Sequence, residues 1–412
     1  MRFVIPALQD FAWRVERGAS NVPDAACYAK RATPSVLRHP FSFSPVAVFL
    51  TILHAGLWLM LAGNLWYLHR PSRTEGESPS DEDDSGRLSV LVPARNEERN
   101  LQRLLPSLLE QDHPRFEVIV YDDGSTDGTA EVLEAAEAEF QEKEGATLRL
   151  LQGNGPPAGW VGKTHALHEA AQEASGDVFL FLDADARLEG PGALRSLARR
   201  FRRLPSETDV LTGFPRLCGA ALLLVSIVPN AILTGLPWPL VRRTPGLPSL
   251  GALNGQCWMI DADTYHRHQP HAACKSDVLE DVEIGRFLKS EGHTPVMRDV
   301  RGEVSIFMYD RYAEAWRGFR KNAYLLMGGT PPAAVLFTSF FLLTFVLAPF
   351  FVPWLWASVF GLKAITDGLG GQPPWVSLFA PLSFLLAVAM QVDSTASHLR
   401  GTVEWKGRRV AS

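Results

Sequence analysis

Uncharged apolar blocks near both ends of the chain flank a central region in which short apolar runs alternate with polar segments. Residues 46–68 contain no Asp, Glu, Lys or Arg, and the same holds for residues 331–362 and 375–392. Each block approaches or exceeds the roughly 20 apolar residues of a membrane-spanning helix. The pattern predicts one amino-terminal span and two carboxy-terminal spans. For the third block, a re-entrant or interfacial helix is the alternative.

Three short apolar runs in the central region are predicted to form buried strands. They cover Leu88–Val92, Phe116–Tyr121 and Val178–Leu182, and they lack the strict alternation of a half-exposed strand. A helix is predicted between the first two, from about Arg99 to Gln111. Strands buried on both faces are typical of a mostly parallel sheet covered by helices. The predicted fold class is therefore α/β.

Acidic pairs follow two of these strands, and a third pair lies further along the chain. Because ligands of open α/β sheets bind beyond the carboxyl ends of the strands, the first two pairs are expected to share one crevice. Acidic side chains with glycine also form turns and helix caps without any chemistry, which is the alternative for each pair. Together with one lysine they suit an anionic nucleotide and a metal: Asp122 and Asp123, Asp183 and Asp185, Glu280 and Asp281, and Lys163.

The order of these motifs resembles that of family 2 glycosyltransferases. The matching segments are Ser-Val-Leu-Val-Pro-Ala-Arg-Asn-Glu-Glu at 89–98, Asp-Asp-Gly-Ser-Thr-Asp at 122–127, Asp-Ala-Asp at 183–185 and Glu-Asp at 280–281. The resemblance covers about Arg87 to Tyr324. It implies a GT-A fold and inverting transfer of a sugar from a nucleotide diphosphate donor.

The resemblance also implies roles for individual residues. Asp185 is the expected ligand of Mg²⁺ or Mn²⁺, and Asp183 belongs to the same metal motif and contacts the ribose. Asp281 is the expected base, with Glu280 beside it, although acids in the first turn of a helix also occur without chemistry. The residues expected to line the nucleotide pocket or bind its base or ribose are Pro93, Arg95, Glu97, Asp122 and Asp123.

The segment 155–164 ends in Gly-Lys-Thr like a phosphate-binding P-loop, but that motif requires Gly at position 157, which is Pro. The segment instead resembles a Gly-Trp-x-Gly-Lys stretch of membrane glycosyltransferases that act on lipids. Lys163 is then expected to contact a donor phosphate, and a solvated lysine at a helix start is the alternative. The segment Asn-Gly-Gln-Cys-Trp at 254–258 resembles the family's Gly-Gln step, which implies that Gln256 and Trp258 help to shape the acceptor pocket.

The segment 316–322 lacks the Gln-x-x-Arg-Trp motif of processive polysaccharide synthases, which places polymer synthesis in doubt. Arg317, Arg320 and Lys321 within it are expected to bind the diphosphate or the membrane surface. Taken together, the motifs and the predicted spans resemble bacterial carotenoid glucosyltransferases, including the chlorobactene type. That resemblance implies transfer of glucose from UDP-glucose to a carotenoid hydroxyl. The alternatives are another lipid acceptor (hopanoid, sphingolipid or glycerolipid), a processive synthase, or a catalytically silent membrane scaffold.

The expected organisation is an extension at 1–45, a span at 46–69, an acidic linker at 70–86, a GT-A domain at 87–325, a membrane region at 331–395 and a basic tail at 396–412. The basic tail favours a cytoplasmic catalytic domain on the cell (inner) membrane, whereas basic residues in 1–45 conflict with that topology. The apolar stretch 220–241 is expected to be interfacial, with a buried core helix as the alternative.

Composition excludes some other classes of function. The formal net charge of −5 owes much to the linker, and no basic tract interleaved with aromatic residues supports nucleic-acid binding. The four cysteines show no Cys-x-x-Cys spacing, so neither a zinc site nor a disulfide framework is indicated. The neighbouring His266, His268 and His271 lack a partner acid at a metal-ligand spacing.

Overall fold

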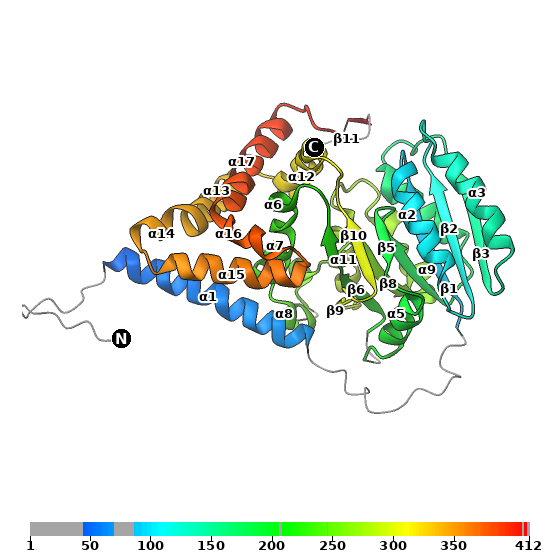
Figure 1. The fold of residues 1–412 in the computed structure, drawn as a ribbon, viewed down its shortest axis with the longest axis horizontal. Helices are drawn as coiled ribbons and strands as arrows, with labels where there is room; N and C mark the ends of the chain where they lie inside the picture. Colours follow the sequence, from blue (N-terminus) through cyan, green and yellow to red (C-terminus); the bar gives the residue numbers. More distant parts are fainter. Residues whose placement is uncertain (1–43, 70–85, 206–207, 245, 406–407, 410–412) are drawn as a thin grey trace, which may run out of the picture. The chain divides into compact units, whose positions relative to one another are not determined.

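The computed structural model describes residues 44–69, 86–205, 208–244, 246–405 and 408–409 (Figure 1). The internal contacts of the chain divide it into two compact units, residues 1–48 and residues 49–412. The strands and helices described below belong to the second unit, apart from the first residues of helix α1 (Pro45–Leu68). Most of the extension at 1–45, most of the linker at 70–86 and part of the basic tail lie outside the described residues.

A seven-stranded sheet forms the centre of the second unit, with the strand order β3-β2-β1-β4-β8-β6-β9. All neighbours are parallel except β8, which runs antiparallel to both β4 and β6. The mostly parallel sheet agrees with the prediction. The strands are β1 (Leu88–Ala94), β2 (Phe116–Asp122), β3 (Ala146–Gln152), β4 (Val178–Leu182), β6 (Val210–Phe214), β8 (Cys257–Asp261) and β9 (Val296–Asp299).

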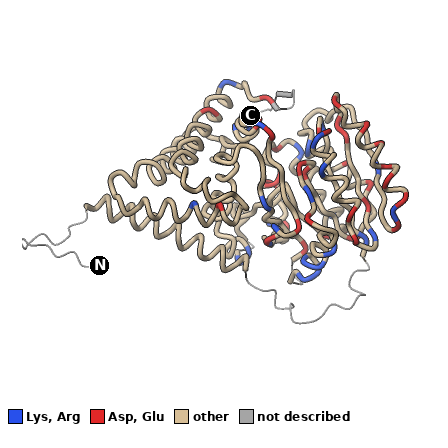
Figure 2. Tube along the Cα trace, viewed as in Figure 1, with Lys and Arg blue, Asp and Glu red and all other residues tan. Residues whose placement is uncertain are grey.

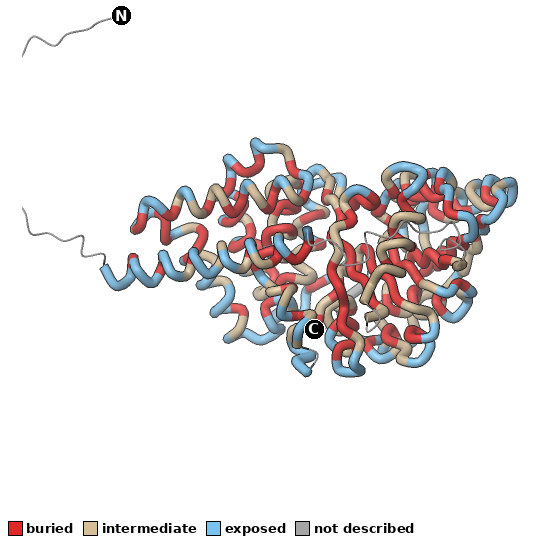
Figure 3. Tube along the Cα trace, turned by 90° about the horizontal axis from the view of Figure 1, so that it is seen from below, coloured by how far each residue is buried: buried red, intermediate tan, exposed pale blue. Residues whose placement is uncertain are grey.

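Helices connect the first four strands and cover both faces of the sheet. Val90 and Val118 face one apolar core together with Leu101 and other residues of α2 (Glu98–Leu109). The strand residues in between face a second core shared with α4 (Gly162–Gln172). Figure 3 shows buried segments in the interior, with exposed segments around them. Burial on both faces explains why these strands read as apolar runs without alternation.

A three-stranded sheet and several helices complete this part. Strand β10 (Val304–Phe307) lies between β5 (Ala186–Leu188) and β7 (Arg216–Cys218). The helices are α3 (Thr129–Gln141), α5 (Ala193–Arg202), α6 (Leu222–Val225), α7 (Ile227–Gly235), α8 (Trp238–Arg243), η2 (Pro248–Leu250), α9 (Ala262–His268), α10 (Pro270–Ala273), α11 (Glu280–Ser290) and α12 (Tyr312–Leu326).

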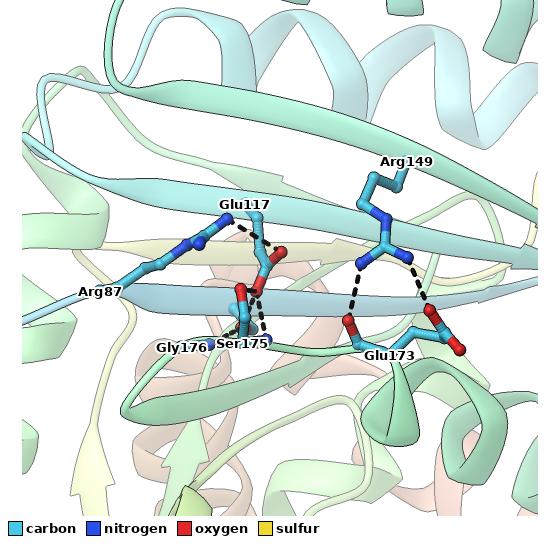
Figure 4. A network of polar contacts seen from close by, with 7 residues as sticks. Arg87, Glu117, Arg149, Glu173, Ser175 and Gly176 are labelled. Carbon is cyan, nitrogen blue, oxygen red and sulfur yellow. Dashed lines mark hydrogen bonds and ion pairs between the residues drawn. The ribbon is translucent and has the colours of Figure 1, made fainter.

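A buried carboxylate fixes the amino-terminal ends of β1 and β2 (Figure 4). Glu117 is 1% exposed and accepts hydrogen bonds from the Ser89 hydroxyl at 2.6 Å and the Ser175 backbone N–H at 2.7 Å. Arg87 adds an ion pair at 3.2 Å. A buried carboxylate with this many donors is stabilised rather than penalised, so Glu117 joins two strands to the turn that precedes β4.

Apolar helices follow and precede this domain: α1 (Pro45–Leu68), α13 (Pro331–Phe341), the π-helical turn η3 (Leu342–Leu347), α14 (Ala348–Phe351), α15 (Leu355–Gly370), α16 (Pro374–Leu378) and α17 (Ala380–Leu399). Figure 2 shows few charged residues on them. Two of the described helical stretches, Pro45–Leu68 and Pro331–Phe351, are long and apolar enough to cross a membrane. The third predicted block falls within α16 and α17, so the number of spans stays a prediction.

The apolar stretch 220–241 forms the short helices α6, α7 and most of α8, none of which is long enough for a span. Trp238 is buried with Leu61 of α1 in one apolar cluster. The side-chain amide of Asn64, also on α1, donates hydrogen bonds to the carbonyls of Leu233 and Leu236 at 2.8 and 2.9 Å. This packing favours the buried-helix alternative over an interfacial helix for the segment around Trp238.

Candidate active site

The predicted acidic pairs meet at the carboxyl edge of the central sheet. Because β1 pairs in parallel with both β2 and β4, the residues that follow these strands emerge at the same edge. Asp122 ends β2, and Asp183 follows β4 directly. Since β8 is antiparallel to β4, Gln256 just before β8 lies there too, and its carbonyl accepts the Asp183 backbone N–H at 3.2 Å.

Lys163 joins two of the acidic pairs. It lies in the first turn of α4, and its Nζ is 2.7 Å from Oδ1 of Asp183 and 2.9 Å from Oε1 of Glu280. The same ammonium donates to the Gly255 carbonyl at 3.4 Å. Burial lowers the pKa of Lys163, but the charges of Asp183 and Glu280 outweigh it and hold the pKa well above its usual value. Lys163 is therefore charged and sits among the acids rather than in solvent.

Glu280 and Asp281 begin helix α11, and close backbone packing sets their position. Asp281 Oδ2 accepts the Gly255 backbone N–H at 3.1 Å, and its Oδ1 accepts the N–H of Val282 at 2.9 Å. A Cβ at Gly251 would lie 2.5 Å from the Gly285 carbonyl oxygen, so the loop before β8 lies directly against α11. Only a glycine permits this approach.

The two acids of this pair have opposite pKa shifts. Burial, with the neighbouring charge of Glu280, raises the pKa of Asp281 to about 6, and Lys163 opposes the shift. Burial also acts to raise the pKa of Glu280, but the charges of Lys163 and Lys321 outweigh it, so that pKa is lowered. One acid with a raised pKa beside one with a lowered pKa is the arrangement that separates a proton acceptor from a fixed anion.

The loops after β1 and β2 are bound to each other. Asp122 Oδ1 accepts the Ser125 backbone N–H at 3.1 Å and so shapes the turn 122–125. Arg95 Nη1 donates to the Asp123 carbonyl oxygen and lies 3.9 Å from its carboxylate. The backbone N–H of Glu97 donates to Thr129 Oγ1 at 2.9 Å. Asp122 therefore has a turn-forming role in addition to any contact with a nucleotide.

The segment 183–185 offers donors that fit a divalent cation. Asp183 and Asp185 supply the hard oxygen ligands that Mg²⁺ and Mn²⁺ prefer. Across the described parts of the chain, no group of three or more His, Cys, Asp or Glu side chains is arranged to hold a metal ion. The donor set therefore fits a cation that takes one or two carboxylates and completes its shell with water and phosphate oxygens.

Two further residues reach this site, Tyr309, which the sequence did not single out, and Lys321, which was expected to bind the diphosphate or the membrane surface. Tyr309, which follows β10 and has a φ of +57°, interacts electrostatically with Asp185 and Asp183, and burial raises its pKa. Lys321 on α12 interacts with the charges of Glu280 and Asp183. No motif marks Tyr309 in the sequence, whereas Lys321 belongs to the segment 316–322 that we had assigned to phosphate or membrane binding.

Two predicted residues, Trp258 and Arg320, make other contacts than expected. Trp258 is 2% exposed and stacks on Phe181 with ring centroids 4.2 Å apart, so it belongs to the core beneath the sheet rather than to an acceptor pocket. Arg320 forms an ion pair with Asp393 of α17 at 3.7 Å, which turns it away from a diphosphate. Arg317 is exposed on α12, and its binding to the diphosphate or the membrane surface stays a prediction.

Comparisons with known proteins agree with this geometry. Residues 89–215, which contain β1, β2 and the segment 183–185, match the family model Glycosyl transferase family 2. Residues 89–215 form a glycosyltransferase family 2 domain. This confirms the class of enzyme expected from the order of the acidic motifs.

The curated relatives of this glycosyltransferase include carotenoid enzymes. It is 33% identical over 159 residues to a 4,4'-diaponeurosporenoate glycosyltransferase of Staphylococcus haemolyticus, a match that covers 37% of this chain and 38% of that protein. It is 24% identical over 360 residues to the protein of the same name from Staphylococcus aureus, covering 78% of this chain and 88% of that one. The resemblance to carotenoid glycosyltransferases is thus confirmed.

Among solved structures, the glycosyltransferase resembles the mannosyltransferase PcManGT of Pyrobaculum calidifontis in complex with GDP-Man and Mn²⁺. The two share 20% sequence identity, with a TM-score of 0.51 over 86% of this chain and 97% of that one. The likeness shows the fold, which is GT-A-like with a mostly parallel central sheet, as predicted.

Proposed function

We propose that this glycosyltransferase transfers glucose from UDP-glucose to the hydroxyl of a carotenoid dissolved in the membrane, with inversion at the anomeric carbon. The observation that carries the proposal is the position of Asp281, which accepts the Gly255 backbone N–H beside Glu280, the acid that shares Lys163 with Asp183. The names of the curated relatives support the acceptor class.

In the proposed reaction, Asp281 takes the proton of the acceptor hydroxyl. The acceptor oxygen forms its bond to the anomeric carbon from the face opposite the diphosphate, while the bond from that carbon to the diphosphate oxygen breaks. UDP leaves with the electron pair of the broken bond. A raised pKa suits this role, because a base works best when its pKa lies near the working pH.

The remaining residues bind and stabilise the donor. Lys163 already lies between Asp183 and Glu280, and we propose that it also contacts the diphosphate, where a fixed positive charge stabilises the leaving group. We propose Asp185, with Asp183, as the ligands of Mg²⁺ or Mn²⁺, which when bound supplies positive charge to the departing diphosphate. Pro93, Arg95, Glu97, Asp122 and Asp123 are proposed to line the nucleotide pocket.

The acceptor is proposed to arrive through the bilayer. The exposed apolar side chains of α13 and α14 include Leu336, Phe340 and Phe351, and such a surface suits lipid rather than water. We propose a multi-pass location in the inner membrane, with the catalytic domain on the cytoplasmic side where nucleotide sugars are available.

The test uses membranes that contain the protein and Mg²⁺, with radiolabelled UDP-glucose or, in parallel, radiolabelled GDP-mannose as the donor, and a panel of acceptors. The panel contains a hydroxylated carotenoid, a carotenoid acid as in the names of the relatives, and glycerolipid, sphingolipid and hopanoid alcohols. Label in the hydroxylated carotenoid supports the proposal. Label only in the carotenoid acid or in a colourless lipid overturns the acceptor, and label only from GDP-mannose overturns the donor.

A further inference from the structure

Helix α12 is held from one side by Asp393 of α17. Trp316 donates its indole N–H to Asp393 Oδ2 at 2.7 Å, and Arg320 Nη1 lies 3.7 Å from the same oxygen. Residues four apart share one face of a helix. This face of α12 is therefore bound to a carboxylate on an apolar helix.

A second contact fixes the backbone of α12. The Ser394 hydroxyl, which is fully buried, donates to the Arg320 carbonyl at 2.6 Å and accepts the Tyr324 backbone N–H at 2.9 Å. Because α17 contacts both the side chains and the backbone of α12, it fixes the rotation of α12 about its own axis.

The opposite face of α12 is turned toward the catalytic acids. At about 100° per residue, Gly318 lies roughly opposite Trp316 and Arg320. A Cβ at Gly318 would lie 2.0 Å from the Tyr309 hydroxyl oxygen, so this face packs directly on Tyr309. Lys321 follows three positions later and shares that side of the helix.

The surroundings of Lys321 are those of a cation at the reaction centre. Its charge interacts with the acids Glu280, Asp183 and Asp281 and with the charge of Lys163. Burial lowers the pKa of Lys321, and the acids oppose this shift. The carboxylates offset only part of the desolvation cost of this ammonium, because its pKa remains lowered.

We propose that Lys321 is a second cation that binds the diphosphate of the donor, and that Asp393 is the residue that positions it by fixing helix α12. The proposal rests on the proposed function, since it concerns the same donor site. It assigns Trp316 and Arg320 to the attachment of α12 rather than to substrate.

The test measures UDP binding to the full-length protein in detergent with Mg²⁺, by calorimetry, together with kcat and KM for sugar transfer. Lys321→Met is expected to weaken UDP binding about tenfold and to lower kcat roughly 100-fold, the usual effect of removing one preorganised charge. Lys321→Arg keeps the charge and is expected to restore most of the UDP affinity. Arg311→Ala, which removes an exposed cation beside the start of α12, serves as the matched control.

Asp393 is tested through its coupling to Lys321. Asp393→Ala is expected to weaken UDP binding in the wild-type background but to add nothing in the Lys321→Met background, because residues that act through one another are not additive. If Asp393→Ala weakens UDP binding equally in both backgrounds and also lowers the melting temperature, the role of Asp393 is purely structural. Unchanged UDP affinity in Lys321→Met would overturn the proposal. Because UDP binding needs no acceptor, failure of carotenoid transfer is a separate outcome.

Discussion

The backbone N–H of Gly255 donates a hydrogen bond to Oδ2 of Asp281 at 3.1 Å, and the missing side chain at position 255 permits this approach. A Cβ there would lie 2.9 Å from the Asp281 Cβ and 3.0 Å from Oδ2. The loop before β8 and the first turn of α11 thus set the position of the proposed base together.

Gly255→Ala is expected to displace Asp281 and to lower kcat roughly 100-fold, the cost of a misplacement of about 1 Å at a reacting group. Steady-state kinetics of sugar transfer measure the effect. Gly192→Ala is the control, because a Cβ at that position meets no atom within 4 Å. Equal kcat values for the two variants would show that Asp281 is not held through Gly255.

The pH dependence of transfer is expected to follow Asp281. Its pKa is raised to about 6 by burial and by Glu280, and the base acts in its ionised form. The value of kcat/KM is therefore expected to rise as the pH rises through about 6, and Asp281→Asn is expected to abolish both the activity and this limb. A flat profile between pH 5 and pH 7 would contradict the assignment.

The raised pKa of Asp281 also predicts an effect on stability: ionisation of Asp281, which favours catalysis, lowers the stability of the folded state. Because folding raises the pKa of Asp281, its ionisation destabilises the folded state as the pH rises from its usual value near 3.8 to about 6. Asp281→Asn is therefore expected to raise the melting temperature at pH 8 and to leave it unchanged at pH 3.5. Thermal unfolding at the two pH values measures the difference.

Removing the charge of Lys163 is expected to affect both donor binding and the proton acceptor. Lys163→Met leaves Asp183 and Glu280 without the ammonium that bridges them, so UDP-glucose binding is expected to weaken about tenfold or more. Since Lys163 lowers the pKa of Asp281, the acidic limb of the pH profile is expected to move to higher pH. A Lys163→Met variant with wild-type KM and pH profile would place Lys163 outside the mechanism.

Glu117 is expected to contribute to the stability of the fold rather than to catalytic activity. Glu117→Ala leaves the Ser89 hydroxyl, the Ser175 N–H and Arg87 without their acceptor, which is expected to lower the free energy of unfolding by about 2–4 kcal/mol. Arg149→Ala breaks the neighbouring pair with Glu173, whose side chains are 42% and 54% exposed, and is expected to cost under about 1 kcal/mol. Denaturant unfolding of both variants makes the comparison. Equal losses would show that burial does not set the strength of these pairs.

The strands and acidic motifs were predictable because their physical causes are local. Two helical layers cover the sheet, so the predicted runs at β1, β2 and β4 are apolar on both faces and agree with the structure to within two residues. Acids placed immediately after such strands must emerge at the same edge. The position of Glu280 and Asp281 at the start of α11 follows the preference of acids for the first helical turn.

The remaining residues of the site depend on contacts between distant segments. Trp258 follows a Gly-Gln step, but the side of β8 that it occupies is set by pairing with β4, which the sequence does not reveal. Arg320 binds Asp393 across 73 positions because α12 and α17 pack together, while Lys321, its neighbour, points to the other side. Adjacent residues of one helix therefore have unrelated roles.

Transfer of label from UDP-[¹⁴C]glucose to a hydroxylated carotenoid, by membranes containing either the wild-type protein or Asp281→Asn, tests the central claim most directly. The account predicts a coloured, labelled product that partitions into the organic phase with the wild-type protein and is lost with the variant, at equal amounts of folded protein. Undiminished labelling by Asp281→Asn would contradict the assignment of the base, and no labelled carotenoid with the wild-type protein would contradict the proposed reaction.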